Sequence, residues 1–460
     1  MSSTIAFFTD PTLAAAGPRV RYVLDALERH PLAPDGMVCL LNPSEMPPDS
    51  AVCFYGKREN APADAVFIPA QEYFFCLQPV DNKQFTINRF QHEKGDVFAV
   101  ERESHSAGQP FFSDQSFSFD WLETLFFHFS RWEEYAPGSS DLDETGLMKS
   151  DAQLLVRYLL HHIPVADRLI AAVFSVLGFK SHIRPTVFSL SHDVDDLEVF
   201  GPGFRLLRYL GGVALRNKSI RRWPTIISDY WKVRRGKAKD PGDTFDLLFR
   251  LGPEVERTIY FGMGNSSSYD HFPALDTPRL LEIRAQALDA GYAAGIHPSF
   301  NTWKNVELLQ QECQRAAAWL SFPITRSRQH YLHFSFPETA DALETAGIEE
   351  DATLGFRDKI GFRAGTGFPF QLYHFQEERP YRWVEKPLVA MDCGLVREGH
   401  SSPEKVRQIW RAFISENAEG TAISLNLHNT YVYEQALHGI DFAVLFGQIL
   451  QNAKGLHRNT

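Results

Sequence analysis

The sequence predicts an α/β protein with a barrel-like C-terminal part. Three observations favour this class. Short apolar segments alternate with segments of helical periodicity over 183–460. Several of the apolar segments end in acidic residues or in histidine. In parallel α/β sheets and barrels, the carboxyl ends of the strands meet at one edge, and ligands bind there.

Length and composition limit the class of protein. The chain has 460 residues, of which 44% are hydrophobic and 22% charged, an ordinary globular composition with room for two or three domains. A net charge of -11 argues against nucleic acid as a partner. The five cysteines lack CxxC spacing, which predicts buried thiols in a reducing compartment. We find no secretory leader and no membrane-spanning stretch in the sequence, so we expect a cytoplasmic protein.

A smaller α/β domain is expected at 1–182, and no catalytic constellation is visible in it. A change of character at 180–185 predicts the boundary with a second domain at 183–460. The expected elements of the first domain are strands at 5–8, 51–55 and 65–68, a helix at 19–27, an aromatic helix from Asp120 to Tyr135, and helices at 152–160 and 165–177. Asp120 is expected to cap the aromatic helix, with Glu123 completing a capping box. His161 and His162 lie at the break between the last two helices, where a surface or capping role is expected.

The strand that opens the second domain carries the clearest functional signal. It runs from Val187 into Ser191, His192, Asp193 and Asp195. Asp193 and Asp195 are two residues apart, so they point to the same side of an extended chain. Two carboxylates on one side repel each other unless a cation or a shared proton lies between them. We therefore expect a metal here, with one carboxylate as ligand and the other as base. The alternative is an ordinary polar turn, since aspartate is common in turns.

The same layout recurs along the second domain. Strands are expected at 258–262 and 422–427, helices at 278–290, 306–320 and 338–345, and polar strand ends near His297, Arg328, His330, Asp351 and His428. Arg363 lies between Gly361 and Gly365, where a flexible backbone can approach a ligand and an arginine can bind an oxyanion. These residues are candidates for one shared site.

A basic and aromatic segment spans 205–239. It contains eleven lysines and arginines, one aspartate (Asp229), and the aromatic residues Trp223, Tyr230 and Trp231. Such a segment could make weak contact with an anionic membrane surface or an anionic glycan. A solvated helical face is the alternative that we favour from sequence alone.

Four stretches, in this order, resemble the motifs of the polysaccharide deacetylases of the NodB-homology group. They are Ser191-His192-Asp193-Val194-Asp195, Gly295-Ile296-His297-Pro298, Arg328-Gln329-His330-Tyr331 and Leu425-Asn426-Leu427-His428. The segment from Gly347 to Thr353, which contains Asp351, also resembles the branch of that group with an Asp-x-Asp motif. The resemblance covers 187–430 and implies a distorted (β/α) barrel, with an additional N-terminal domain of unknown function.

The resemblance also implies roles for individual residues. Asp193 would be the general base, oriented by Arg328, and His428 the general acid for the leaving amine. Asp195 and His297 would bind Zn²⁺ or another divalent transition metal. Arg363, Asp351 and His192 are assigned to substrate binding.

One position departs from the family pattern. The family usually has a second histidine four residues after the first, and this chain has Asn301 there. Asparagine is a poor zinc ligand. We therefore expect His330 as the third ligand, with His192 as the second choice.

The expected activity is removal of an N-acetyl or other acyl group from an amino sugar or glycan precursor. Two alternatives stay open. The protein could be a carbohydrate-binding relative that has lost its metal, or another metal-dependent hydrolase of C–N amide bonds. The expected partner is the sugar substrate itself.

Overall fold

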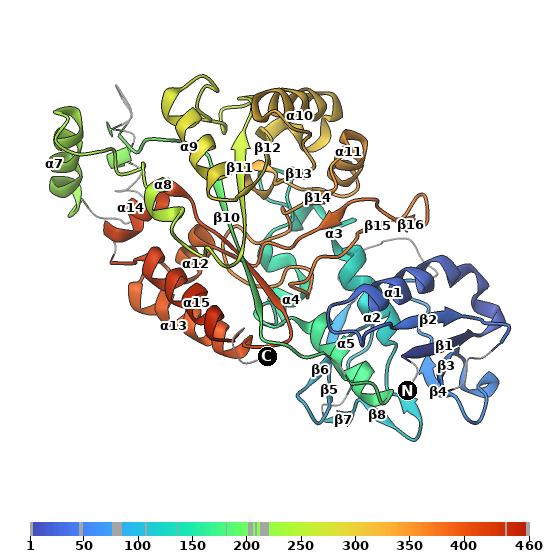
Figure 1. Cartoon of the computed structure of the whole chain (residues 1–460). Helices are drawn as coiled ribbons and strands as arrows, with labels where there is room; N and C mark the ends of the chain where they lie inside the picture. The colour runs from blue at the N-terminus through green and yellow to red at the C-terminus, as the bar shows by residue number, and fades with distance from the viewer. Residues whose placement is uncertain are drawn as a thin grey trace.

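The computed structural model describes residues 3–45, 49–75, 85–105, 108–135, 137–180, 182–200, 206–207, 209–211, 220–437 and 439–456. Two parts can be followed in Figure 1, an N-terminal part that runs from blue to green and a C-terminal part that runs from green to red. Among the described residues, the helices are too short or too polar to span a lipid bilayer. Cys39, Cys53, Cys313 and Cys393 are free and buried, as predicted, and Cys76 lies outside the described residues.

An eight-stranded parallel sheet forms the centre of the C-terminal part. Its strands, in the order in which they pair, are β17 (Val384–Glu385), β14 (Glu350–Asp351), β13 (Arg326–Ser327), β12 (Ala293–His297), β11 (Glu256–Gly262), β10 (Val187–Val194), β19 (Ala422–Asn426) and β18 (Ala390–Met391). The first and last strands, β17 and β18, follow each other closely in the chain. The sheet is therefore a curved half-barrel, consistent with the predicted (β/α) barrel, with one short connection between its two edges.

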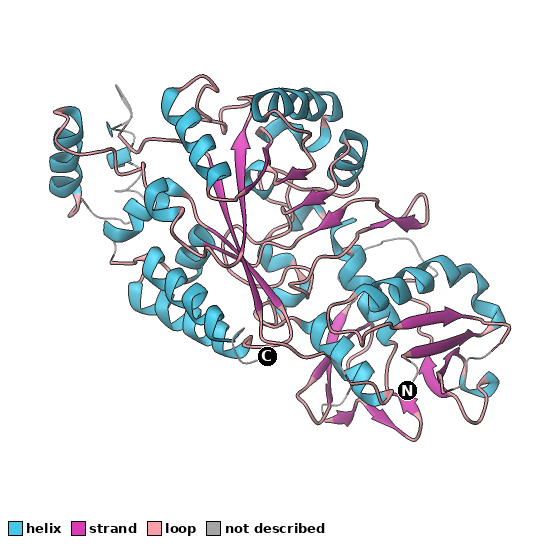
Figure 2. Ribbon diagram, in the orientation of Figure 1, coloured by secondary structure: helices cyan, strands magenta, loops and turns pink. Residues whose placement is uncertain are grey.

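Helices lie on the outside of this sheet (Figure 2). They are α8 (Phe245–Leu248), α9 (Pro278–Asp289), α10 (Val306–Leu320), α11 (Glu338–Ala346), α12 (Asp392–Glu398), α13 (Pro403–Glu416), α14 (Asn429–Leu437) and α15 (Phe442–Leu456). The predicted helix at 306–320 matches α10 residue for residue, because Asn305 caps its start by accepting a hydrogen bond from the Leu308 N–H. A further helix, α7 (Trp223–Arg234), stands away from the sheet. The strand-then-helix alternation predicted for this part is confirmed.

The N-terminal part has a six-stranded sheet and a three-stranded sheet. The first pairs β2 (Val38–Leu41), β1 (Thr4–Thr9), β3 (Ala51–Gly56), β4 (Val66–Pro69), β9 (Ser116–Phe117) and β8 (Phe112–Ser113), and the second pairs β6 (Val97–Glu101), β5 (Thr86–Gln91) and β7 (Gln109–Pro110). Helices α1 (Gly17–Arg29), α2 (Trp121–Ser130), α3 (Trp132–Tyr135), α4 (Leu154–Arg157) and α5 (Val165–Val176) complete it. The expected strands at 5–8, 51–55 and 65–68 correspond to β1, β3 and β4.

The aromatic helix differs from its prediction in two ways. Asp120 does cap α2 by accepting a hydrogen bond from the Glu123 N–H. The Glu123 carboxylate, however, accepts hydrogen bonds from the Tyr73 and Phe75 N–H groups of a neighbouring loop, so no capping box forms. The helix also breaks at Arg131, which adopts a left-handed conformation (φ 55°). The break lets the buried Arg131 guanidinium turn toward Glu134, with Nη2 2.5 Å from Oε1.

Side chains of the two parts contact each other directly. Tyr22 of α1 packs edge-to-face on Tyr373, with ring centroids 4.9 Å apart, and its hydroxyl donates to the Gln371 carbonyl. Arg19 pairs with Glu378 at 2.6 Å. A single hydrophobic cluster contains buried residues of both parts. The division of the chain at 182 and 183 stays a prediction.

Candidate metal centre

Neighbouring strands bring the predicted polar residues to one edge of the half-barrel. Asp193 lies at the end of β10, Asp195 just beyond it, and His297 ends β12. Arg328 and His330 follow β13, and His428 comes two residues after β19. All of these strands are parallel, so their carboxyl ends meet at the same edge. These residues therefore lie at or just after the carboxyl ends of parallel strands, as the sequence predicted.

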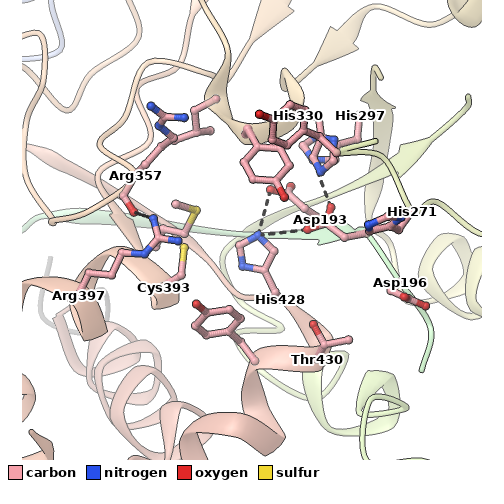
Figure 3. A pocket seen from close by; sticks show the side chains of 16 residues that line it. Asp193, Asp196, His271, His297, His330, Arg357, Cys393, Arg397, His428 and Thr430 are labelled. Carbon is pink, nitrogen blue, oxygen red and sulfur yellow. Dashed lines mark hydrogen bonds and ion pairs between the residues drawn. The ribbon is translucent and has the colours of Figure 1, made fainter. Parts of the chain in front are cut away.

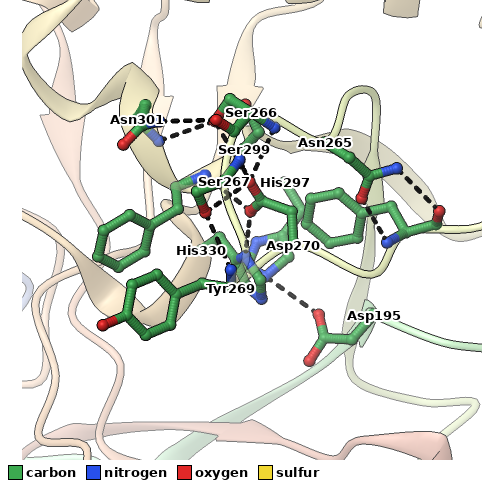
Figure 4. A network of polar contacts seen from close by, with 12 residues as sticks. Asp195, Asn265, Ser266, Ser267, Tyr269, Asp270, His297, Ser299, Asn301 and His330 are labelled. Atoms are coloured by element: carbon green, nitrogen blue, oxygen red, sulfur yellow. Dashed lines mark hydrogen bonds and ion pairs between the residues drawn. The ribbon is translucent and has the colours of Figure 1, made fainter.

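Asp195, His297 and His330 come together as a group of donors. Each offers one ligand atom, and the three atoms all lie within 4.8 Å of one another. Asp195 Oδ1 is 3.3 Å from His297 Nε2, and Figure 4 shows both side chains facing His330. Of the described residues, none donates a hydrogen bond to Asp195 Oδ1, although that oxygen is buried. A cation would satisfy it.

Both imidazole rings of this group are held by their second nitrogen. The His297 Nδ1 atom lies 2.6 Å from the Arg328 carbonyl, and the His330 Nδ1 atom lies 2.8 Å from Asp270 Oδ1. A ligating histidine usually donates its other ring N–H to a carbonyl or carboxylate in this way, which fixes the ring and leaves Nε2 for the ion. Two imidazoles and one carboxylate fit zinc and other divalent transition metals.

Asp270 is itself fixed in place. It accepts hydrogen bonds from the backbone N–H groups of Ser266, Ser267 and Phe300 (Figure 4). Desolvation would raise the pKa of Asp270, but His330 and these donors outweigh it and lower the pKa to about 2. The ionised carboxylate therefore supports the His330 ring.

The backbone at His330 is unusual. Tyr331 and Leu332, the next two residues, have φ values of 58° and 50°. A left-handed conformation costs a residue with a side chain roughly 1–2 kcal/mol. Strain of this kind collects at functional sites, where the surrounding structure over-determines the backbone.

Asn301, which replaces the family's second histidine, takes no part in the donor group. Its side-chain amide donates to the Ser266 carbonyl, and its backbone N–H donates to the Ser266 hydroxyl (Figure 4). The structure therefore places the two histidines of the group on β12 and on the segment after β13. The role of His330 as the third ligand stays a prediction.

Asp193 is buried beside the group, and each of its carboxylate oxygens accepts one hydrogen bond. Its Oδ1 accepts from Arg328 Nη1 at 2.9 Å, and its Oδ2 accepts from Asn426 Nδ2 at 2.8 Å. Burial would raise the pKa of Asp193, but the charges of Arg328, His297 and His428 outweigh it and lower the pKa. The Arg328 side chain also packs over the Tyr260 ring, 4.5 Å from its centroid, which fixes its direction.

His428 faces both aspartates. Its Nε2 lies 3.8 Å from Asp193 Oδ2 and 3.8 Å from Asp195 Oδ2 (Figure 3). Its Nδ1 lies 2.7 Å from Asp392 Oδ1, and its backbone N–H donates to Asp392 Oδ2. Burial would lower the pKa of His428, but the carboxylates of Asp392, Asp195 and Asp193 raise it to about 10. The geometry therefore gives an imidazole that is oriented by one carboxylate and aimed at two others.

Two further groups of side chains in the described part of the chain have metal-ligand spacing. One is Asp392, Cys393 and His428, and the other is His161, His162 and Glu398. In the first, burial raises the pKa of the Cys393 thiol, and a neutral thiol is a weak ligand. In the second, the Glu398 carboxylate already pairs with His162 at 2.7 Å and accepts from the Ile360 N–H. His161 is buried and not on the surface as expected.

The donor group opens into a cavity of about 270 Å³. The Tyr269 and Tyr331 side chains are 42% and 45% exposed at its edge. Arg357 and Arg397 line another side (Figure 3). Arg397 donates to the Arg357 carbonyl, and none of the described carboxylates lies within ion-pair distance of it. The cavity thus combines an acidic, histidine-rich floor with aromatic and cationic walls.

Two residues assigned to substrate binding do not line this cavity. His192 alternates with Asp193 along β10, so its ring points to the opposite face, where it contacts the Leu427 carbonyl and the Tyr292 hydroxyl. Burial lowers the pKa of His192 to about 4. Asp351 is fully buried and accepts hydrogen bonds from the Ser327 hydroxyl and the Thr353 N–H. We therefore do not retain either residue in the site.

Arg363 is also placed differently from its prediction. Its guanidinium forms a two-pronged ion pair with Glu134 and donates to the Gly355 carbonyl. The side chain is only 5% exposed and borders a neighbouring cavity of about 300 Å³. Its glycine-rich flanks suggested a ligand-binding loop, but they let the backbone approach the N-terminal part, where a Cβ on Gly361 would lie 2.2 Å from the His161 carbonyl oxygen.

Substituting Arg363 should therefore affect stability and not metal binding. We expect Arg363→Met to lower the free energy of unfolding by on the order of 3 kcal/mol, because the buried Glu134 keeps only Arg131 as a partner and the Gly355 carbonyl loses a donor. Chemical denaturation measures this, and metal content should not change. The exposed pair of Arg168 and Glu416 offers a control, since Arg168→Met should cost less than about 1 kcal/mol. Loss of the metal in Arg363→Met without loss of stability would contradict this assignment.

Two residues of the site were missed from the sequence. Asp270 lies in a serine-rich loop without periodicity, so no strand end marked it. Asp392 directly follows the two-residue strand β18, and the apolar run 388–391 before an acid was a signal that could have been found. Both act through a histidine of the site.

Comparisons with known proteins identify little of this chain. Residues 12–181 match the model of a family of unknown function (DUF7033), which does not include the candidate site. No curated protein matches the chain. A solved structure described as "putative polysaccharide deacetylase from Mycobacterium smegmatis" is similar at 13% identity and a TM-score of 0.31, covering 59% of this chain and 94% of its own.

Proposed function

We propose that the protein is a metal-dependent hydrolase that removes an acyl group, acetyl in the first instance, from the nitrogen of an amino sugar or glycan precursor. The observation that carries the proposal is the donor group of Asp195, His297 and His330 beside Asp193 and His428. The resemblance of the four strand-end stretches to the deacetylase motifs supports the same reading.

Asp195, His297 and His330 would hold the ion, which when bound supplies Lewis-acid polarisation of the amide carbonyl and of the attacking water. Asp193 accepts the proton of that water as the new C–O bond forms. Arg328 and Asn426 hold the Asp193 carboxylate in place, and Arg328 favours its ionised form. Asp193 is therefore a base with a fixed position.

His428 supplies the proton that the departing nitrogen needs. When the C–N bond breaks, the amine takes a proton from His428 Nε2, and the products are a carboxylic acid and a free amino group. Asp392 is a positioning residue here, because its contact with Nδ1 directs Nε2 into the cavity. The base and the acid both face the space above the donor group (Figure 3).

The walls of the cavity favour a sugar substrate. Exposed tyrosine rings at a cavity edge offer flat apolar faces, on which the C–H faces of a sugar ring can stack. Arg397 favours a substrate that also carries an anionic group, such as a nucleotide-linked or lipid-linked amino sugar, whereas Arg357 already pairs with Asp143.

Acetate release tests the proposal. Protein loaded with Zn²⁺, Co²⁺ or Ni²⁺ is incubated with N-acetylglucosamine oligomers and with a nucleotide-linked N-acetyl amino sugar, and free acetate and free amine are measured. We expect equal amounts of both products, loss of turnover with a chelator, and recovery when metal is added back. Binding of the sugars without any turnover by metal-loaded protein would favour the binding-protein alternative. Turnover only of small non-sugar amides would favour another C–N hydrolase.

A further inference from the structure

Helix α7 forms a small unit that stands out from the half-barrel (Figure 1). Its inner face packs in a separate hydrophobic cluster with α14, through Trp223, Ile226, Tyr230 and Val233 of α7 and Tyr433 of α14. Asp229 accepts a hydrogen bond from the Tyr433 hydroxyl at 3.1 Å. The contacts therefore fix which face of α7 points to the protein and which points away.

The outer face of α7 carries large apolar side chains. Trp231 is 52% exposed and Ile227 is 36% exposed, and they are four residues apart on the same side of the helix. Ile220, in the turn before α7, is 62% exposed. The inner face already supplies the packing that the helix needs, so these outer residues have no role in its core.

Basic residues lie on α7 and on both sides of it in the chain. Within 220–239 they are Arg221, Arg222, Lys232, Arg234, Arg235, Lys237 and Lys239. Asp229 is the one acid in that range, so seven positive charges and one negative charge leave +6, in a chain with a net charge of -11. Lys232 pairs with Asp229 at 2.8 Å, and Lys239 pairs with Asp246, outside the range, at 3.1 Å. The Arg235 guanidinium lies over the Trp231 ring, 5.5 Å from its centroid. The other basic residues of the predicted segment, at 205, 208, 216 and 218, lie outside the described residues.

We propose that the outer face of α7 docks on an anionic membrane surface. Lipid headgroups with negative charge attract juxtaposed lysines and arginines, and the boundary below them accepts Trp and aliphatic side chains. A soluble polyanion would use the charges but offers no apolar phase for Ile220, Ile227 and Trp231. The combination of both features on one projecting helix therefore favours a lipid surface.

Docking at α7 would bring the candidate site near the membrane. Helix α14, on which α7 rests, begins directly after His428, and its Thr430 and Tyr431 line the cavity. The proposal does not depend on the hydrolase activity, because its support comes from α7 alone.

Vesicle flotation tests the proposal with the full-length protein. We expect binding to phosphatidylcholine vesicles that contain phosphatidylglycerol and not to vesicles of phosphatidylcholine alone. Binding should fall steeply between ~0.1 M and ~1 M salt, where the Debye length shrinks from about 10 Å to about 3 Å. Two double variants should each weaken binding by about tenfold or more. The first combines Arg234→Glu with Arg235→Glu, and the second combines Ile227→Asp with Trp231→Asp.

Matched variants elsewhere control for charge and surface polarity. Lys405→Glu with Arg411→Glu makes the same charge change on exposed residues of α13, and Val444→Asp changes an apolar residue of α15 that is 49% exposed. These controls should bind as the unmodified chain does. The proposal fails if anionic vesicles do not bind, if the α7 variants bind as well as the controls, or if heparin binds while vesicles do not.

Discussion

His297→Ala should abolish both metal content and turnover. The purified chain is expected to hold about one transition-metal ion, as a site with three protein ligands does, and the variant should hold far less after dialysis. Because Lewis-acid assistance is worth several kcal/mol and each ~1.4 kcal/mol is a factor of ten in rate, kcat/KM should fall by several orders of magnitude. Inductively coupled plasma mass spectrometry and acetate release measure the two effects on the same sample.

His271 provides the matched control for His297. It is an exposed histidine that lines the same cavity and is outside the donor group. His271→Ala should therefore keep the ion, whatever it does to substrate binding. If His297→Ala keeps its metal while His271→Ala loses it, the donor group has been misassigned.

Asp193→Asn should remove the general base without removing the metal ion. The amide cannot act as a base, so we expect kcat to fall by ~10²–10⁴, which is the usual contribution of general acid–base catalysis. The metal content should persist, because Asp193 is not one of the three donors. The readouts are steady-state kinetics with saturating Zn²⁺ and metal analysis of the same preparation.

The hydrogen bonds of Asp193 call for a second variant. In Asp193→Asn the new NH₂ group meets a donor from either Arg328 or Asn426, which could also destabilise the fold. The exchange of Asp193→Asn with Asn426→Asp restores a carboxylate–amide pair at this contact. It should recover the unfolding midpoint but not the rate, because the carboxylate then lies on β19. Recovery of the rate together with the midpoint would rule out Asp193 as the base.

The part of the site that the sequence predicted lies on or directly after regular strands. Asp193, Asp195 and His297 follow apolar runs whose length and composition are typical of buried strands, and parallel strands deliver their ends to one edge. The same reasoning placed His428, whereas Arg328 was placed by the resemblance to the deacetylase motifs. Once the half-barrel has formed, the parallel strands bring these side chains to the same edge of the sheet.

The residues that were misplaced depend on packing that no local pattern encodes. His192 is adjacent to Asp193, but strand alternation turns it to the opposite face, against Tyr292. Arg363 is drawn from a predicted ligand loop into a buried ion pair with Glu134, which is 229 residues away in the chain. Asp270 was missed because it lies in a loop, where periodicity gives no signal. Asp392 was marked only by the short apolar run 388–391 that precedes it.

Anomalous diffraction from crystals of the protein loaded with zinc tests the central claim most directly. We predict one strong peak at the zinc edge, about 2.0–2.2 Å from an Asp195 carboxylate oxygen and the Nε2 atoms of His297 and His330. A peak at His161, His162 and Glu398, or at Asp392, Cys393 and His428, with none at the first group, would contradict the account.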